Sequence, residues 1–297
     1  MNSKSRAFKA VDILLIVLMI LPAVFGIVLN VLTKPQSDEI TVSGARIFFA
    51  IPMPLQNLPI TESQVNSAIV ILMVFWLCLY LTHGIKTVPD LKRQHIAEWI
   101  VQTTEKMTVE NMGEYFRAYA PFMVGIMGLS AFSSLLTLIG LYPPTSDINI
   151  VGGWALLVFF LITYYKFKCG PLGYLKSFVE PVPLLAPLNI ISEFATPVSM
   201  AFRHYGNVLS GSVISVMVGA LLQWLTKLVL GWLPGFLGQI PFLQIGLPAV
   251  LSLYFDIFSG CLQAFIFAML TMLYVSGAFP MEEYFEKKKK KLKNGGL

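Results

Sequence analysis

The chain has 297 residues, of which 56% are hydrophobic and 12% charged, and its mean hydropathy is +0.72. Soluble domains carry about 25% charged residues, so the composition excludes an ordinary soluble protein and indicates an integral membrane protein. The three cysteines are widely spaced and form no CxxC motif, which argues against a disulfide framework or a cysteine-ligated metal. The net charge of +5 does not point to nucleic acid, because the basic residues gather in a few loops.

Apolar stretches long enough to cross a bilayer, which takes about 20 residues, recur along the chain. Spans are predicted over residues 11–32, 65–81, 119–141 and 151–165. The first stretch is longer than the apolar core of a signal peptide, about 7–15 residues, which favours a retained helix over a cleaved signal. Spans two to four therefore lie within residues 65–168.

Two longer apolar tracts, 187–230 and 243–279, follow and are separated by the Gly/Pro-rich turn GWLPGFLGQIP. Each exceeds what an upright helix needs, so it must tilt, kink or break. The predicted fold is an all-α membrane protein with four transmembrane helices and a long, strongly tilted helical hairpin over 187–279. Residues 280–297 form a basic tail, and the chain 1–297 is predicted to be one integral-membrane domain.

Residues 89–112 have the pattern of an amphipathic helix that lies on the membrane surface. Charges occupy one helical face, and the other face carries Ile96, Trp99, Ile100, Thr103 and Met107. His95 and Glu98 are spaced i, i+3 on the polar face, but a third metal ligand is missing, so they are interpreted as solvated side chains. No metal or cofactor site is predicted.

The distribution of lysine and arginine between the spans predicts the orientation. Basic residues are frequent in the N-terminus, the loop 82–118, the loop 166–186 and the tail, and sparse in the alternate loops. Placing the rich loops inside puts 17 of the 21 basic residues on the cytoplasmic side and two outside, as the positive-inside rule requires. Both termini are therefore predicted to be cytoplasmic.

Polar residues in the two long tracts fall at helical spacing and form one stripe on each helix. The first stripe contains Ser199, Arg203, Gly206, Asn207 and Ser210. The second contains Ser252, Asp256, Ser259, Gly260 and Gln263. The glycines of the first tract (Gly206, Gly211 and Gly219) would let another helix approach closely.

A charge at bilayer depth costs at least about 2.5–3.5 kcal/mol, and such residues usually face a cavity or a partner. Arg203 cannot lose its proton, whereas Asp256 can, so the two stripes together would suit an ion pathway. A structural ion pair between Arg203 and Asp256 is the alternative. Glu193 could line an aqueous opening or snorkel to the interface, and His204 could be packed in the core or relay protons.

The segment PLNIISEFATPVSMAFRHYGNVLSG resembles the signature of subunit a of F-type ATP synthases, in which a run like S-x-x-x-R-x-x-G-N carries an essential arginine. The segment DIFSGCLQAFIFAMLTMLYVSGAF is similar to the last helix of that family, and GLYPPTSDINI and GPLGYLKSF also resemble family segments. The resemblance spans about residues 66–280. Two departures are His204-Tyr205 in place of the usual Leu-Phe, and Ser212 where many relatives have an ionisable residue.

The resemblance implies that Arg203 faces the c-subunit ring and separates two aqueous half-channels. Asn207 and Gln263 would line that contact, Asp256 would serve the outer half-channel and Glu193 the cytoplasmic one. The remaining candidate lining residues are Ser199, His204, Ser210, Ser212, Ser252 and Ser259. The implied partners are the c-ring, the b subunits of the peripheral stalk, membrane lipid and, indirectly, the F1 sector.

The resemblance therefore implies a non-catalytic, ion-translocating stator subunit, and the chain has no GxxxxGK[ST] phosphate loop of its own. A secondary transporter with a midplane arginine that binds an anionic substrate is the alternative, although residues 1–186 contain no second copy of the Arg203 stripe. A membrane-embedded enzyme would need a motif that is not found. The sequence leaves proton and sodium both open, and the expected location is a bacterial inner membrane.

Overall fold

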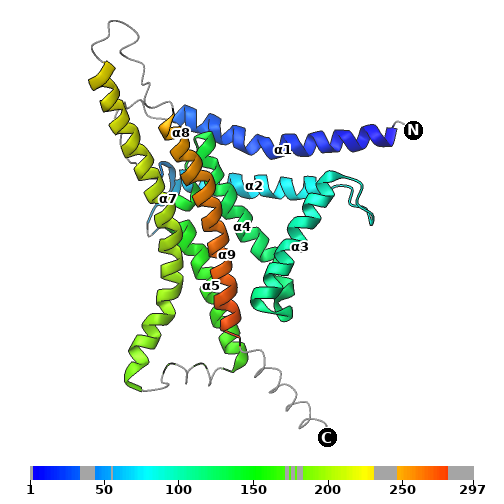
Figure 1. The fold of residues 1–297 in the computed structure, drawn as a ribbon, viewed down its shortest axis with the longest axis vertical. Coiled ribbons are helices and arrows are strands. Elements are labelled where there is room, and N and C mark those ends of the chain that lie inside the picture. Colours follow the sequence, from blue (N-terminus) through cyan, green and yellow to red (C-terminus); the bar gives the residue numbers. More distant parts are fainter. Residues whose placement is uncertain are drawn as a thin grey trace. The chain divides into compact units, whose positions relative to one another are not determined.

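A computed structural model describes residues 3–33, 44–54, 56–170, 174, 178, 183–230 and 246–279. Most of these residues are helical, and among them six helical segments are long and apolar enough to cross a membrane (Figure 1). The chain divides into two compact units. Unit 1 comprises Met1–Trp99, Ile126–Asp147 and Tyr205–Ala264, and unit 2 comprises Ile100–Gly125, Ile148–His204 and Phe265–Leu297.

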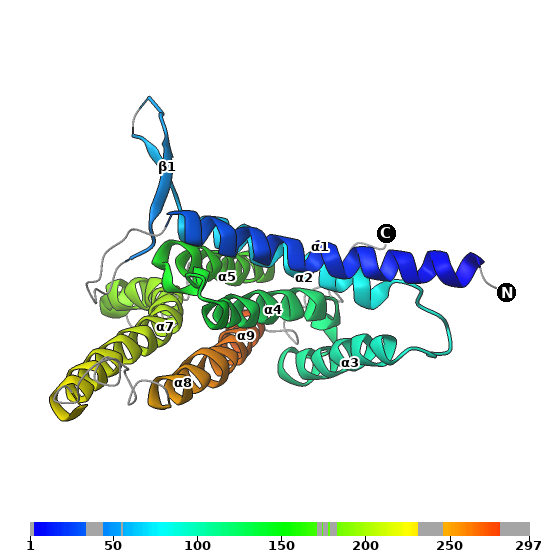
Figure 2. The same cartoon turned by 90° about the horizontal axis from the view of Figure 1, so that it is seen from above.

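In unit 1, helix α1 (Ser3–Thr33) lies along helix α2 (Glu62–Thr82) (Figures 1 and 2). The pair is joined near one end by Asp12, which accepts hydrogen bonds from Arg93 Nη1 at 2.5 Å and pairs with His83 Nδ1 at 3.0 Å. Near the other end, Asn30 donates to Glu62 Oε1 at 3.2 Å. Polar side chains thus tie α1 to His83 and Arg93 at one place and to Glu62, at the start of α2, at another.

A short antiparallel hairpin, β1 (Ile47–Ile51) and β2 (Leu58–Thr61), precedes α2. Figure 2 shows the hairpin projecting away from α1 and α2. The all-α prediction did not include these strands. Isoleucine and phenylalanine, which favour strands, make up most of β1, and the prolines that follow β1 favour a turn.

Helix α3 (Lys92–Met112) confirms the helix expected over 89–112. Ile96 and Trp99, on the predicted apolar face, are 52% and 66% exposed. The buried residues of α3 are the polar Gln94, Thr104 and Thr108, together with Met112 at its end. The exposure of the apolar face is what contact with lipid would require.

The third and fourth predicted spans are also found as helices. The first of them consists of η1 (Glu114–Tyr119), α4 (Ala120–Leu135) and η2 (Leu136–Ile139), and it ends at Gly140, whose φ of +78° closes the helix in the left-handed conformation. A short turn η3 (Pro144–Ser146) leads into α5 (Ile148–Cys169). α5 extends beyond the predicted 151–165 at both ends, by three residues at its start and four at its end.

The first long tract is a single continuous helix, α7 (Ala186–Leu230), preceded by the turn η4 (Pro183–Leu185). Its 45 residues make it about 68 Å long at 1.5 Å per residue, more than twice the thickness of the hydrocarbon core. Pro197 lies inside α7 without ending it. The turn GWLPGFLGQIP and the basic tail lie outside the described residues.

The second long tract is not one regular helix. It begins as α8 (Leu247–Ser252), continues as the π-helix η7 (Leu253–Ser259), and returns to α-helix in α9 (Gly260–Gly277). The predicted stripe from Ser252 to Gln263 assumed 3.6 residues per turn throughout, whereas residues Leu253–Ser259 of this segment are π-helical. A π-helix has i→i+5 hydrogen bonds and shifts every following side chain around the axis.

Two glycines allow close contacts to this irregular segment within unit 1. A Cβ atom built on Gly260 would lie 2.5 Å from Ser134 Cβ, and one on Gly211 would lie 3.0 Å from Phe255 Cδ1. The expectation of close approach is therefore confirmed for Gly211. For Gly206 and Gly219 it stays a prediction, because their built Cβ atoms meet no atom of the described residues within 4 Å.

Candidate functional site

The polar stripe of α7 lies on an exposed side of the helix. Ser199, Arg203, Asn207 and Ser210 are all exposed. Arg203 has no ion-pair or hydrogen-bond partner among the described residues of its own unit. A permanently charged guanidinium thus lies on the exposed side of α7.

Asn207 and Gln263, which the sequence assigned to the same contact, are brought together in unit 1. Asn207 Nδ2 donates a hydrogen bond to Gln263 Oε1 at 2.7 Å. Gln263 is only 2% exposed, whereas Asn207 is exposed. The amide pair therefore links the stripe of α7 to the first turn of α9 and fixes the orientation of the Gln263 amide.

Asp256 lies in the π-helix η7 and is half-buried. The side chain of Thr137, in η2, lies next to it within unit 1. Ser252 and Ser259 are half-buried on either side of it. Ser212 donates its hydroxyl to the backbone oxygen of Leu209 at 2.8 Å, so the serine proton is already engaged within the helix.

His204 is fully buried in unit 2 and lies off the exposed stripe. Its ring packs edge-on against Trp154 and Phe267, with centroid distances of 6.0 Å and 5.6 Å. The sequence left two interpretations of His204 open, core packing or proton relay. Its surroundings are those of a packed core side chain.

Glu193 lies at the first part of α7 and is paired with Lys166 of α5. Lys166 Nζ lies 2.7 Å and 2.5 Å from the two carboxylate oxygens, and the Tyr174 hydroxyl donates to Oε1 at 3.4 Å. Burial and the nearby charge of Glu193 raise the pKa of Tyr174, so this phenol stays neutral and acts as a donor. A pocket of about 220 Å³ opens beside the pair.

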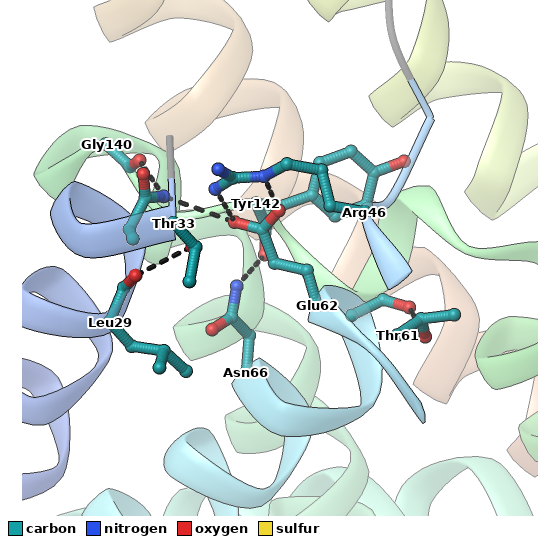
Figure 3. Close-up of polar contacts among 10 residues, drawn as sticks. Leu29, Thr33, Arg46, Thr61, Glu62, Asn66, Gly140 and Tyr142 are labelled. Carbon is teal, nitrogen blue, oxygen red and sulfur yellow. Dashed lines mark hydrogen bonds and ion pairs between the residues drawn. The ribbon is translucent and has the colours of Figure 1, made fainter. Parts of the chain in front are cut away.

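A second group of polar contacts surrounds Glu62 at the start of α2 (Figure 3). Arg46 binds the carboxylate with two hydrogen bonds, Nε to Oε2 at 2.8 Å and Nη2 to Oε1 at 3.0 Å. Asn30 of α1 donates to the same carboxylate and to the backbone oxygen of Gly140. Glu62 is 4% exposed, so the hairpin, α1 and α2 all meet at one buried charge.

The next two turns of α2 continue this group toward the connection between η2 and α5. Asn66 donates to the backbone oxygen of Tyr142 at 2.8 Å, and Ser63 donates to Asp147. Burial and the charge of Asp147 raise the pKa of Tyr142. The hydrogen bonds to the Glu62 carboxylate, helped by its negative charge, raise the pKa of Arg46 above its usual value.

Sequence reasoning assigned no chemistry to residues 34–64 and counted Lys166 only as a loop charge. For residues 34–64 one sequence signal was available: Thr61 and Gln64 have the spacing of a capping box. In the structure, the Thr61 N–H donates a hydrogen bond to Gln64 Oε1 at 3.3 Å. That pattern marks the start of α2 and places Glu62 in its first turn, where a helix favours negative charge. Nothing in the local sequence indicated the partners Arg46 or Glu193.

Taken together, the fold and these residues define a multi-pass helical membrane protein with charged and amide side chains held on its helices. The family model described as the ATP synthase A chain matches residues 64–276. The chain is 30% identical over 264 residues to ATP synthase subunit a of Nitratidesulfovibrio vulgaris (strain DP4), an alignment that covers 87% of this chain and 95% of that protein.

Two other relatives show the same similarity. The chain is 27% identical over 277 residues to a protein of Propionigenium modestum named ATP synthase subunit a, sodium ion specific, covering 82% of this chain and 88% of that one. It is 32% identical over 196 residues to ATP synthase subunit a of a Sulfurihydrogenibium species, covering 64% and 84%. The chain therefore belongs to the family of subunit a of F-type ATP synthases.

Proposed function

We propose that this chain is the stator subunit that passes ions across the membrane at a contact with a rotating ring of c subunits, and thereby couples ion flow to ATP synthesis. The guanidinium of Arg203, which is exposed on the polar stripe of α7 and has no ion-pair partner among the described residues of its unit, carries this proposal. A fixed cation on that surface would force ionisation of a ring carboxylate that arrives in its neutral form from the lipid. The same cation would also prevent ions from leaking directly from one side of the membrane to the other.

The other site residues have roles that follow from where they lie. The Asn207–Gln263 pair would line the ring contact beside Arg203. Asp256, with Thr137 beside it, would receive ions from the outside. Glu193, next to the pocket in unit 2, would exchange ions with the cytoplasm. ATP chemistry would take place elsewhere in the complex, so the chain itself would be non-catalytic.

The proposed arrangement in the membrane has four transmembrane helices and a tilted hairpin made of α7 and the α8–α9 segment. Tilting is supported by the length of α7, which an upright helix cannot fit into the hydrocarbon core. The bias of basic residues supports cytoplasmic termini, and the bacterial origin of the relatives supports a bacterial inner membrane.

Proton transport is the favoured chemistry, and sodium is the second candidate because one relative is named sodium ion specific. Proton transport and sodium transport are distinguished by varying the sodium concentration at constant pH while ATP synthesis is driven by an imposed gradient. Synthesis that needs sodium at every pH would show that sodium is the transported ion.

The proposal is tested with Arg203→Ala in membrane vesicles that contain the whole complex. ATP-driven acidification should fall to background, because no other described residue of the exposed stripe is positively charged, and the passive ion leak under an imposed gradient should rise. Lys227→Ala is the matched control, since Lys227 is also an exposed cation on α7 but lies far along the helix from the stripe. Pumping retained in Arg203→Ala would refute the proposed role.

A further inference from the structure

The pocket beside Glu193 is formed by three helices of unit 2. Its lining includes Lys166 of α5, Glu193 and Thr196 of α7, and Tyr274 of α9, together with apolar side chains. A volume of about 220 Å³ has room for several water molecules, each of which occupies about 30 Å³ in the liquid. Water in such a pocket would reach the carboxylate of Glu193 directly.

Within this pocket, the ammonium group of Lys166 contacts both oxygens of the Glu193 carboxylate. Its ammonium lies 2.7 Å from Oε1 and 2.5 Å from Oε2, and the carboxylate and ammonium side chains are 14% and 28% exposed. The described titratable groups that face Glu193 are Lys166, Tyr174 and, across the pocket, Tyr274. Lys166 is the only one of these three that is positively charged at neutral pH.

We propose that Lys166 is a positioning residue for ion transfer: its ammonium competes with the transported ion for Glu193 and so keeps the carboxylate from retaining that ion. An ion that arrives at Glu193 must displace the ammonium, and the ammonium returns when the ion leaves. The inference rests on the proposed function of Glu193 and adds the residue that controls how readily Glu193 gives up its ion.

A purely structural role for Lys166, as a brace between α5 and α7, would predict a different result. A brace needs only a bond between two helices, whereas competition needs a positive charge at the carboxylate. The neighbouring Lys168 provides the comparison. It lies in the same helix, is exposed, and interacts with tyrosines instead, with Nζ 2.8 Å from the Tyr115 hydroxyl and over the Tyr164 and Tyr165 rings.

The test uses ATP synthesis driven by an imposed gradient in inverted vesicles, whose cytoplasmic face is turned to the medium. Lys166→Gln, Lys166→Arg and Lys168→Gln are compared, and rates are normalised to the amount of assembled complex. Medium pH and sodium concentration are varied separately. Lys166→Gln should lower the rate by about tenfold, the usual effect of losing a hydrogen bond to a charged group, because an unpaired carboxylate releases its ion less readily.

For a transported proton, the loss in Lys166→Gln should be largest at acidic medium pH and should shrink as the pH rises. Lys166→Arg should restore most of the rate, and Lys168→Gln should match the unaltered complex at every pH. A Lys166→Gln complex with an unchanged pH and sodium profile would overturn the inference, even if less complex were assembled. The inference would also be overturned if Lys168→Gln changed the rate as much as Lys166→Gln does.

Failure of the inference is distinguishable from failure of the proposed function. Glu193→Gln should abolish the dependence on Lys166, so that Lys166→Gln has no further effect in that background. Normal synthesis and a normal pH profile in Glu193→Gln would remove Glu193 from the ion path and overturn the inference. The role of Arg203 would still stand or fall by its own pumping experiment.

Discussion

The carboxylate of Glu62 is a buried charge that depends on a single cation. Arg46 satisfies both of its oxygens, and Asn30 adds a third hydrogen bond from α1. Taking such a carboxylate out of water is costly unless it is paired and hydrogen-bonded. Arg46 therefore does more for stability than an exposed arginine would, because its removal leaves the charge uncompensated.

We expect Arg46→Ala to destabilise the protein by about 3 kcal/mol, the low end of the range for breaking a buried pair, since Arg46 is a quarter exposed. Thermal unfolding of the purified full-length chain in detergent would measure this. The double variant Arg46→Ala, Glu62→Gln should recover part of the loss because it removes the negative charge as well. If the double variant lost as much as the sum of the two single variants, the pair would not be coupled.

Arg203 and Asp256 can be recognised as candidate functional residues from the sequence, whereas Glu62 cannot. Both interrupt tracts of apolar residues, so their cost at bilayer depth marks them as functional candidates. Glu62 adjoins the polar stretch 34–61 and looks like an ordinary charge at a helix start. Its burial results from contacts with α1 and the hairpin, which local composition does not encode.

At the scale of the elements, the segment around Asp256 combines an irregular helix with a close helix contact. The π-helix η7 carries Asp256, and Gly260 immediately follows it at the start of α9. π-Helical turns are rare and occur often at functional sites. The contact of Gly260 with Ser134 holds the end of η7 against α4 within unit 1.

Gly260→Ala should destabilise this packing, because the new Cβ would lie 2.5 Å from Ser134 Cβ, where neither side chain nor backbone can easily move away. The expected loss is about 1–3 kcal/mol, as for other overpacked sites. Gly128→Ala, in α4, is the control, since its built Cβ meets no described atom within 4 Å. Thermal unfolding in detergent compares the two, and equal stability would show that η7 adjusts without cost.

The apolar tracts predicted the helices well because membrane spans are defined by length and hydropathy. The same reasoning failed at two elements. The hairpin β1–β2 was missed because a short, two-stranded ribbon has little signal of its own. The π-helix was missed because an apolar tract with regular spacing does not reveal an extra residue in one turn.

For the whole molecule, the orientation can be tested with single cysteines placed in a background where Cys78, Cys169 and Cys261 are replaced by serine. Met53→Cys, in the hairpin region, should react with an impermeant maleimide in right-side-out vesicles. His95→Cys, in α3, should react in inverted vesicles, because the basic loop 82–118 is expected inside. Both native side chains are exposed, so labelling of both from the same side would contradict the predicted topology.

The sequence by itself determined the class of protein, the positions of most helices, the family and the stripe that contains Arg203. These are local properties: hydropathy needs only a run of neighbours, and a stripe on one helix needs only regular spacing. The family resemblance likewise depended on several contiguous segments, each of which can be read from the sequence alone.

Only the tertiary structure decided which polar groups meet. The hydrogen-bonded partners Arg46 and Glu62 are 16 residues apart, Lys166 and Glu193 are 27 apart, and Asn207 and Gln263 are 56 apart. In each case the partner is chosen by how helices pack, and packing depends on side-chain shape over the whole unit. Composition shows that a buried charge needs a partner, but the fold determines which residue that partner is.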